Sequence, residues 1–173
     1  VGRAGLAEPG FGAAGFDAAR NASESDRDTA QRYALLAALG ATHDPALGAR
    51  ARDYGLTPAV QIGEMASLYG AQMDEPENRA MMWQWLQRHF DAYRARLPAF
   101  AQSRLPALVA DGRCDVAGAD ELSTFFAPRI AQLIGGERGL AQTLERIRQC
   151  GALRTHLGAG ALADWNAMPA AAD

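Results

Sequence analysis

Histidine is the residue of this sequence best suited to acid–base chemistry or metal binding, and it occurs at His43, His89 and His156. A zinc-binding helix of the H-E-x-x-H type needs a second ligand one turn away, and none of the three has one. His89 lies on an apolar helical stripe beside Phe90, which indicates a core residue. His43 and Asp44 lie in an apparent turn between helices, where capping explains both, and His156 is assigned no role.

Other motifs that carry chemistry are absent from the sequence. It has no G-x-S-x-G elbow and no Walker A loop. Gly158-Ala159-Gly160 reads as a helix breaker, and the acidic cluster Asp74, Glu75 and Glu77 as the negative first turn of a helix. We therefore predict no catalytic, cofactor-binding or metal-binding residues. A small helical enzyme assembled around His89 and nearby carboxylates is the weaker alternative, because no nucleophile is paired with a base.

Large aromatic, cationic and sulfur side chains are expected to serve packing or solvation. Trp85 falls on the core stripe of its helix, and Trp83 is expected to pack on a neighbouring hairpin. Cys114 and Cys150 have no metal-type spacing and are predicted to be isolated buried thiols. Five arginines are expected at solvated positions, with carboxylate binding on a concave face as the alternative: Arg79, Arg88, Arg94, Arg96 and Arg104.

The composition favours an all-α fold and excludes some partners. The chain has 173 residues, of which 49% are hydrophobic, enough for one domain with a real core. Val and Ile occur only four times each, so residues that suit strands are scarce. All 17 basic residues are arginine, and the net charge of −3 without a basic patch argues against nucleic-acid binding. No apolar run is long enough to span a bilayer.

Breaks and caps divide the sequence into short helices. Residues 1–15 are expected to be irregular, and Ser23 and Ser25 to cap a helix that ends at Gly40. Asp44-Pro45, Thr57-Pro58 and Glu75-Pro76 read as helix starts. The helix after Thr57-Pro58 is expected to reach about Gly70. The helix after Glu75-Pro76 is expected to reach Phe90, and Asp91 to cap a following short segment. Later helices are expected around 97–109, 119–126, 128–134 and 137–151, with a last pair beyond.

We expect eight to ten helices joined by short connections. A chain of this kind stacks into an irregular α-α superhelix of antiparallel hairpins, a HEAT- or armadillo-like solenoid without a fixed sequence period. Residues 16–173 are expected to form one helical-repeat domain. Because the chain begins at Val1, we expect it to be part of a longer multidomain protein.

Four ordered groups of residues resemble a known family. They are Leu35-Leu36-Ala37-Ala38-Leu39-Gly40 with Thr42-His43-Asp44-Pro45, then Pro76-Glu77-Asn78-Arg79 with Trp83-Gln84-Trp85-Leu86, then Glu121-Leu122-Ser123-Thr124-Phe125-Phe126, and Gly136-Glu137-Arg138-Gly139-Leu140 with Leu144-Glu145-Arg146-Ile147-Arg148. In this order the chain resembles, over about residues 16–165, the C-terminal helical domain of zinc aminopeptidases. The family includes aminopeptidase N and the puromycin-sensitive and endoplasmic-reticulum aminopeptidases.

The resemblance implies a non-catalytic domain of a zinc-dependent peptidase. In that family the zinc ion and its motifs belong to preceding domains, so we expect no cofactor in this chain and zinc in the parent. The helical domain forms a concave cover over the active site and limits or binds peptide substrates. The implied partners are the chain's own N-terminal catalytic domain and peptides. A bacterial cytoplasm or periplasm is expected, without a choice between them. An independent solenoid that binds a protein or peptide remains the alternative.

Overall fold

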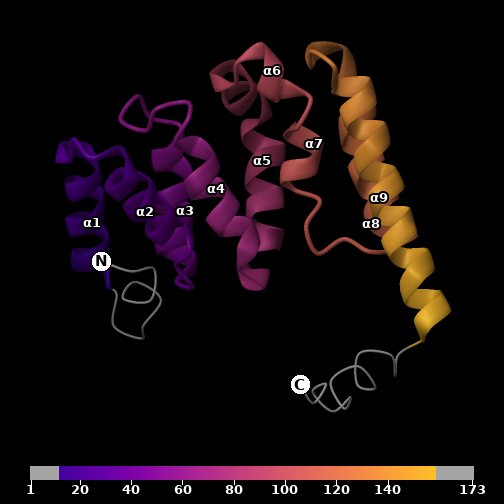
Figure 1. Ribbon diagram of the computed structural model, residues 1–173, viewed down its shortest axis with the longest axis horizontal. Coiled ribbons are helices and arrows are strands. Elements are labelled where there is room, and N and C mark those ends of the chain that lie inside the picture. The colour runs from indigo at the N-terminus through magenta and orange to yellow at the C-terminus, as the bar shows by residue number, and fades with distance from the viewer. Residues whose placement is uncertain (1–11, 159–173) are drawn as a thin grey trace, which may run out of the picture.

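The computed structural model describes residues 12–158, and every regular element in that range is helical. Figure 1 shows the helices following one another along the long axis in sequence order. The all-α prediction is confirmed for this range. In chain order the elements are α1 (Ala13–Ser25), α2 (Thr29–Gly40), α3 (Pro45–Gly55), α4 (Met65–Asp74), α5 (Pro76–Arg96), α6 (Ala99–Gln102), α7 (Leu105–Leu108), α8 (Val116–Phe126), the 3₁₀ helix η2 (Ala127–Gln132) and α9 (Gly136–Leu157).

The first helix starts earlier than the sequence suggested. α1 begins at Ala13, so the last residues of the segment 1–15 are helical rather than irregular. Residues 1–11 and 159–173, including Leu162, Trp165 and most of the Gly158-Ala159-Gly160 breaker, lie outside the described range. Leu153 and Leu157, expected to open a last pair of helices, instead continue α9.

The capping prediction for Ser23 and Ser25 is wrong. Both lie in the last turn of α1, where the Ser23 hydroxyl donates to the Arg20 carbonyl at 2.7 Å and the Ser25 hydroxyl bonds one turn back in the same way. Serine in a helix can bond to the preceding turn, which competes with capping the next helix. Asp28 is the true cap of α2, and its carboxylate accepts from the Ala30 N–H at 2.9 Å.

Helix starts that combine an acidic residue with proline are placed correctly. Asp44 caps α3 by accepting from the N–H groups of Ala46 and Leu47 at 2.8 and 2.9 Å, with Pro45 in the first turn. Pro76 likewise opens α5. These helix starts depend only on neighbouring residues. The N–H groups of a first turn have no partner within the helix, and proline fits there because it has no N–H to leave unpaired.

Thr57-Pro58, in contrast, does not start a helix. The chain makes turns until Met65, and α4 then runs past Gly70 to Asp74. Arg96, at the end of α5, donates to the carbonyls of Leu56, Thr57 and Val60. These carbonyls are thereby paired by a distant side chain, and the segment does not need a helix to satisfy them.

Two glycines allow helices to touch through their backbones. A Cβ on Gly40 would lie 2.2 Å from the Leu68 carbonyl oxygen, so α2 and α4 meet where only glycine fits. A Cβ on Gly139 would lie 1.8 Å from the Ser103 carbonyl oxygen, which joins α9 to the link between α6 and α7 in the same manner. These close backbone contacts therefore fix α2 against α4 and α9 against the α6–α7 link.

The core contains two aromatic groups. Around α4 and α5, Tyr69 packs on Trp85 and Tyr93 with ring centroids 5.4 and 4.9 Å apart. Farther along the chain, Trp83 packs edge-on against Phe125 at 5.1 Å, and the fully buried Phe126 lies beside them. Trp83 and Trp85 thus point to opposite sides of α5, and that helix joins the two groups.

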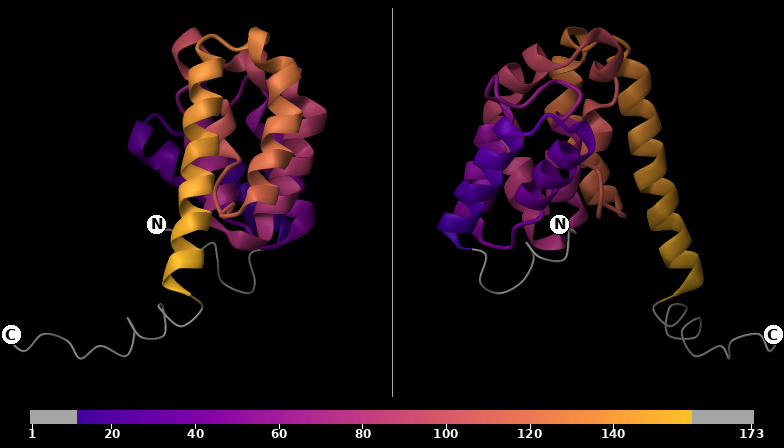
Figure 2. Two further views of the ribbon diagram at one scale, coloured as in Figure 1. Left: turned by 90° about the vertical axis from the view of Figure 1, so that its right-hand side faces the viewer. Right: turned by 60° about the vertical axis from the view of Figure 1, so that its left-hand side comes forward.

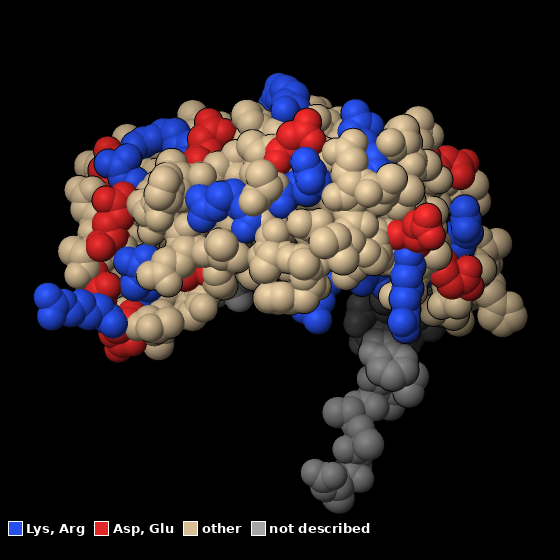
Figure 3. All heavy atoms as spheres, turned by 90° about the horizontal axis from the view of Figure 1, so that it is seen from above, with Lys and Arg blue, Asp and Glu red and all other residues tan. Residues whose placement is uncertain are grey.

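The C-terminal end of α9 lies apart from the other helices. Figure 2 shows in both views that the end of α9 extends beyond the other helices. Seen from above in Figure 3, arginines and acidic residues are mixed over the surface, so this face has no extended area of one charge. Among the described helices, none is both long and apolar enough to cross a membrane.

Candidate functional site

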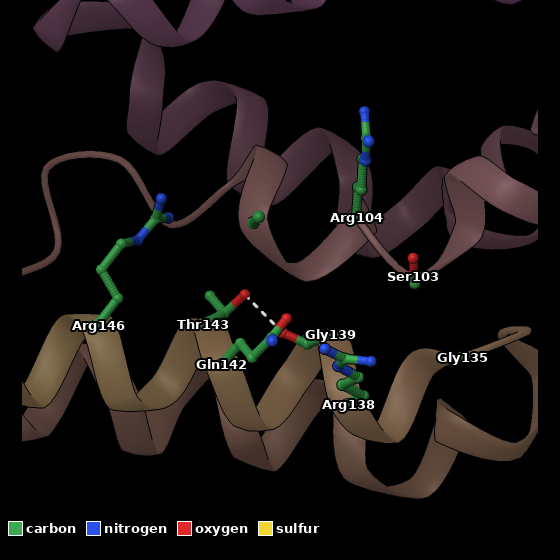
Figure 4. Close-up of a pocket in the computed structure, with 9 residues that line it drawn as sticks. Ser103, Arg104, Gly135, Arg138, Gly139, Gln142, Thr143 and Arg146 are labelled. Carbon is green, nitrogen blue, oxygen red and sulfur yellow. Dashed lines mark hydrogen bonds between the residues drawn. The ribbon is translucent and has the colours of Figure 1, made fainter.

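A groove with a largely polar lining lies between the start of α9 and the α6–α7 link. Its volume is about 510 Å³. Figure 4 shows it with α9 along one wall and the residues around Ser103 and Arg104 along the other. Its lining residues are Ser103, Arg104, Ala107, Gly135, Arg138, Gly139, Gln142, Thr143 and Arg146.

The sequence of α9 places its polar side chains along this groove. Gly135 adopts a left-handed conformation with φ of 69°, which turns the chain into the helix. Gly139 then contacts the Ser103 backbone. Arg138, Gln142 and Arg146 follow at intervals of four residues and therefore share one helix face.

The groove is cationic but does not form a closed anion site. Arg104 and Arg138 are exposed, and within the described residues neither has a carboxylate within salt-bridge distance. Arg146 has one distant partner, Asp111 at 3.9 Å, and both side chains are more than half exposed. Figure 4 shows the three guanidinium groups spread apart rather than meeting at one point. The groove thus attracts negative charge without fixing the position of a small ion.

An apolar groove adjoins the cationic one and shares Arg104 and Ala107 with it. It has a volume of about 480 Å³ and lies between the α3–α4 loop, the end of α5 and α6. Phe100 is 79% exposed and Ile62 is 51% exposed at its rim. The two grooves together therefore place an apolar surface beside positively charged side chains.

A third group brings one histidine and two carboxylates together. His43 Nε2 lies 3.7 Å from a Glu75 oxygen and Nδ1 lies 3.8 Å from a Glu77 oxygen. Their donor atoms all lie within 4.8 Å of one another, so the three residues could hold a metal ion. However, each imidazole nitrogen faces a different carboxylate, an arrangement that suits an exposed ion-pair network equally well. This group was not predicted from the sequence because His43 lies more than 30 residues before Glu75 and Glu77.

The other histidines do not join this group. His89 stacks on Trp85 with centroids 4.9 Å apart and has non-helical backbone angles, which mark a kink in α5. This agrees with its interpretation as a packing residue. His156 is exposed in the last turn of α9. Of the acidic cluster, Glu77 lies in the first turn of α5 as predicted, whereas Asp74 is the last residue of α4.

Both tryptophans of α5 pack as predicted. Trp85 is 3% exposed and its indole N–H donates to Asp53 at 2.8 Å. Trp83 is 5% exposed and donates to Glu121 of α8 at 2.6 Å, with Arg113 lying over its ring. Both rings are therefore part of the packed interior.

The five candidate arginines have different surroundings. Arg96 binds three loop carbonyls, and Arg79 donates to the Met73 carbonyl at 2.8 Å, so both hold the fold together. Arg94 pairs with Asp91 at 3.8 Å, and Arg88 is exposed. Of the five, only Arg104 lines the two adjoining grooves. Arg138 and Arg146 were not among the candidates, although their spacing on α9 was a usable signal.

The prediction of two isolated cysteines is wrong. Cys114 and Cys150 form a disulfide with their Cα atoms 5.0 Å apart. α8 and α9 fold back on each other, which brings residues 36 positions apart in sequence to the open end of the hairpin. Sequence spacing alone does not reveal this pairing, because the packing of α8 against α9 determines whether the two Cα atoms lie close enough for a disulfide.

A comparison with protein families identifies the kind of domain that this chain forms. Residues 1–149 match the model of the ERAP1-like C-terminal domain. The chain belongs to this family. A comparison with curated proteins finds no matching relative. The resemblance to the aminopeptidase C-terminal domain is thus confirmed, and an ERAP1-like C-terminal domain is a non-catalytic part of an aminopeptidase.

Proposed function

We propose that this ERAP1-like domain covers the active site of a zinc-dependent aminopeptidase and limits or binds the peptides that reach it. The family match over residues 1–149 carries the proposal. A catalytic domain in the same polypeptide is the partner, and it would supply the zinc ion and the hydrolytic residues. Neither the H-E-x-x-H motif nor a nucleophile paired with a base is present in this sequence.

The surface chemistry supports peptides as the ligand class. The apolar groove at Phe100 and the cationic groove at Arg104 adjoin each other, and they match an apolar side chain and a carboxylate. A row of helices also offers a long surface without requiring a particular sequence. A cover built in this way can exclude folded proteins and bulk water from a zinc site. Family membership favours this account over an independent scaffold.

The first experiment compares the full-length parent with the chain of residues 1–173. We expect the parent to contain one zinc ion per polypeptide, to release N-terminal residues from peptides and to lose this activity with a chelator. We expect the chain alone to hydrolyse no aminoacyl anilide. A parent without zinc or without aminopeptidase activity would overturn the proposal, as would hydrolysis by the isolated chain.

The second experiment tests peptide contact in the full-length parent. We expect Arg104→Glu to raise KM for peptides of about ten residues while leaving KM for a small aminoacyl anilide unchanged, because only a peptide is long enough to reach a cover over the active site. Arg88→Glu is the matched control, since Arg88 is also exposed but lines neither groove. Equal effects of the two variants on peptides would contradict a role for the groove.

A further inference from the structure

The disulfide lies where the apolar packing of α9 ends. The last buried side chain of the helix is Ile147, at 1% exposure, and Cys150 follows three residues later. Between residue 148 and residue 158 every position is exposed except Gly151, which is half-buried. Within residues 12–158, apolar burial therefore does not hold the end of this helix.

Cys114 attaches the end of α9 covalently to the preceding loop. It lies in the loop between α7 and α8, and its sulfur bonds to Cys150 of α9. A Cβ on Gly151 would lie 3.1 Å from the Cys114 carbonyl oxygen, so helix and loop also touch through their backbones. The chain has only these two cysteines, and both are used in this bond.

We propose that this domain functions in an oxidising compartment, where the Cys114–Cys150 bond is the covalent attachment of the last helix. Disulfides persist in the periplasm, in the endoplasmic-reticulum lumen and outside cells, whereas cytosolic thiol systems keep cysteines reduced. The inference does not depend on the proposed peptidase function, because it rests only on how α9 is held.

The chemistry is a two-electron thiol–disulfide exchange. The two thiols lose two protons and two electrons as the S–S bond forms, and a disulfide-bearing oxidant of that compartment becomes a dithiol. In a reducing cytosol the reverse exchange occurs with a small thiol, which is itself oxidised to its disulfide. Cys114 is half-buried and Cys150 is exposed, so exchange partners can reach the sulfur atoms both to form the disulfide and to reduce it.

The first test labels thiols of the full-length protein in its source cells. Living cells are treated with a membrane-permeant maleimide before lysis, and peptides are then analysed by mass spectrometry without reduction. We expect a linked peptide pair containing Cys114 and Cys150, with labels on both only after reduction. Maleimide on both residues before reduction would overturn the inference.

The second test asks whether the bond holds the helix end. In the oxidised full-length protein, a dithiol should speed amide hydrogen exchange of residues 148–157 by about tenfold or more, with α2 and α4 unchanged. The double variant Cys114→Ser with Cys150→Ser should show the fast exchange at once and no response to the dithiol. Equal exchange in the oxidised and reduced protein would contradict the attachment role.

Discussion

The two ends of the helix row are held together by different means. From α1 to α5 the helices enclose large buried side chains and several buried polar groups, among them Glu64, Gln72 and Asn78. From α6 to α9 the buried apolar side chains end at Ile147, part-way along α9. Beyond that residue the Cys114–Cys150 disulfide attaches α9 to the rest of the domain. The first region is stabilised by burial, and the second combines burial with a covalent bond.

Buried polar side chains tie the helices of the first region together. Arg52 is 4% exposed and donates to Gln72 at 2.7 Å, while Gln72 donates to the Gly40 carbonyl at 2.8 Å. Asn78 of α5 donates to the Thr42 carbonyl at 2.8 Å. Burial lowers the pKa of the Arg52 guanidinium. Unpaired buried groups are costly, so such ties favour one arrangement of helices.

The largest expected effect is loss of a buried ion pair in the first region. Glu64 is 3% exposed and accepts from Arg32 at 2.6 and 2.9 Å. Glu64→Ala leaves the Arg32 guanidinium, whose side chain is only 12% exposed, without its carboxylate and should lower the free energy of unfolding by about 3–5 kcal/mol. Urea denaturation measures this. Glu77→Ala, at an exposed position, should change it by less than about 0.5 kcal/mol, and equal effects would argue against the buried pair.

Core packing should matter in the second region only as far as Ile147. Leu122 of α8 is fully buried, and Leu122→Ala should cost about 2–5 kcal/mol through lost contacts and a cavity. Leu153 is 57% exposed beyond the last packed turn, so Leu153→Ala should change stability by less than about 0.5 kcal/mol. Thermal unfolding of both variants checks this. A large loss for Leu153→Ala would show that the end of α9 has an apolar partner.

The covalent attachment should contribute less than a fully broken buried pair, but more than surface contacts. For a closed loop with a sequence separation of 36, the chain-entropy model gives about 4 kcal/mol, and measured values are usually about 2–4 kcal/mol. Reduction should lower the urea midpoint of the wild type and leave that of the double serine variant unchanged. An unchanged urea midpoint of the wild type after reduction would mean that the disulfide adds no stability and that core packing alone stabilises this region.

The sequence predicts those features that depend on neighbouring residues. Asp44-Pro45 starts a helix through a cap and a proline within one turn, and at Glu75-Pro76 the proline stands in the first turn without a side-chain cap. The missed features join distant residues. Arg96 donates to carbonyls about 40 positions away in a segment that forms turns, and the disulfide depends on how α8 and α9 fold back. Both grooves likewise need the tertiary fold, although the Arg138, Gln142 and Arg146 spacing indicates a shared face.

Acid should weaken the first region before the second, and this is the smallest effect we predict. The hydrogen bonds from Arg32 hold the pKa of the Glu64 carboxyl below its ordinary value of about 4.5. A depressed folded-state pKa adds stability above the unfolded-state pKa, and this stability is lost as the pH falls through the folded-state pKa. Free energies of unfolding measured from pH 6 down to about pH 3 should fall for the wild type.

Glu64→Gln is the matched control, because its amide keeps the shape of the side chain and does not titrate in this range. The variant should be less stable than the wild type at pH 6, and the difference should shrink toward pH 3 as the wild-type carboxyl takes up a proton. The reduced disulfide should lower stability by the same amount at both pH values, since this loss comes from the missing covalent constraint on the chain. A difference between wild type and Glu64→Gln that stays constant with pH would mean that the carboxylate charge does not hold α2 to the α3–α4 loop, and hydrogen-bond geometry would then account for the pair.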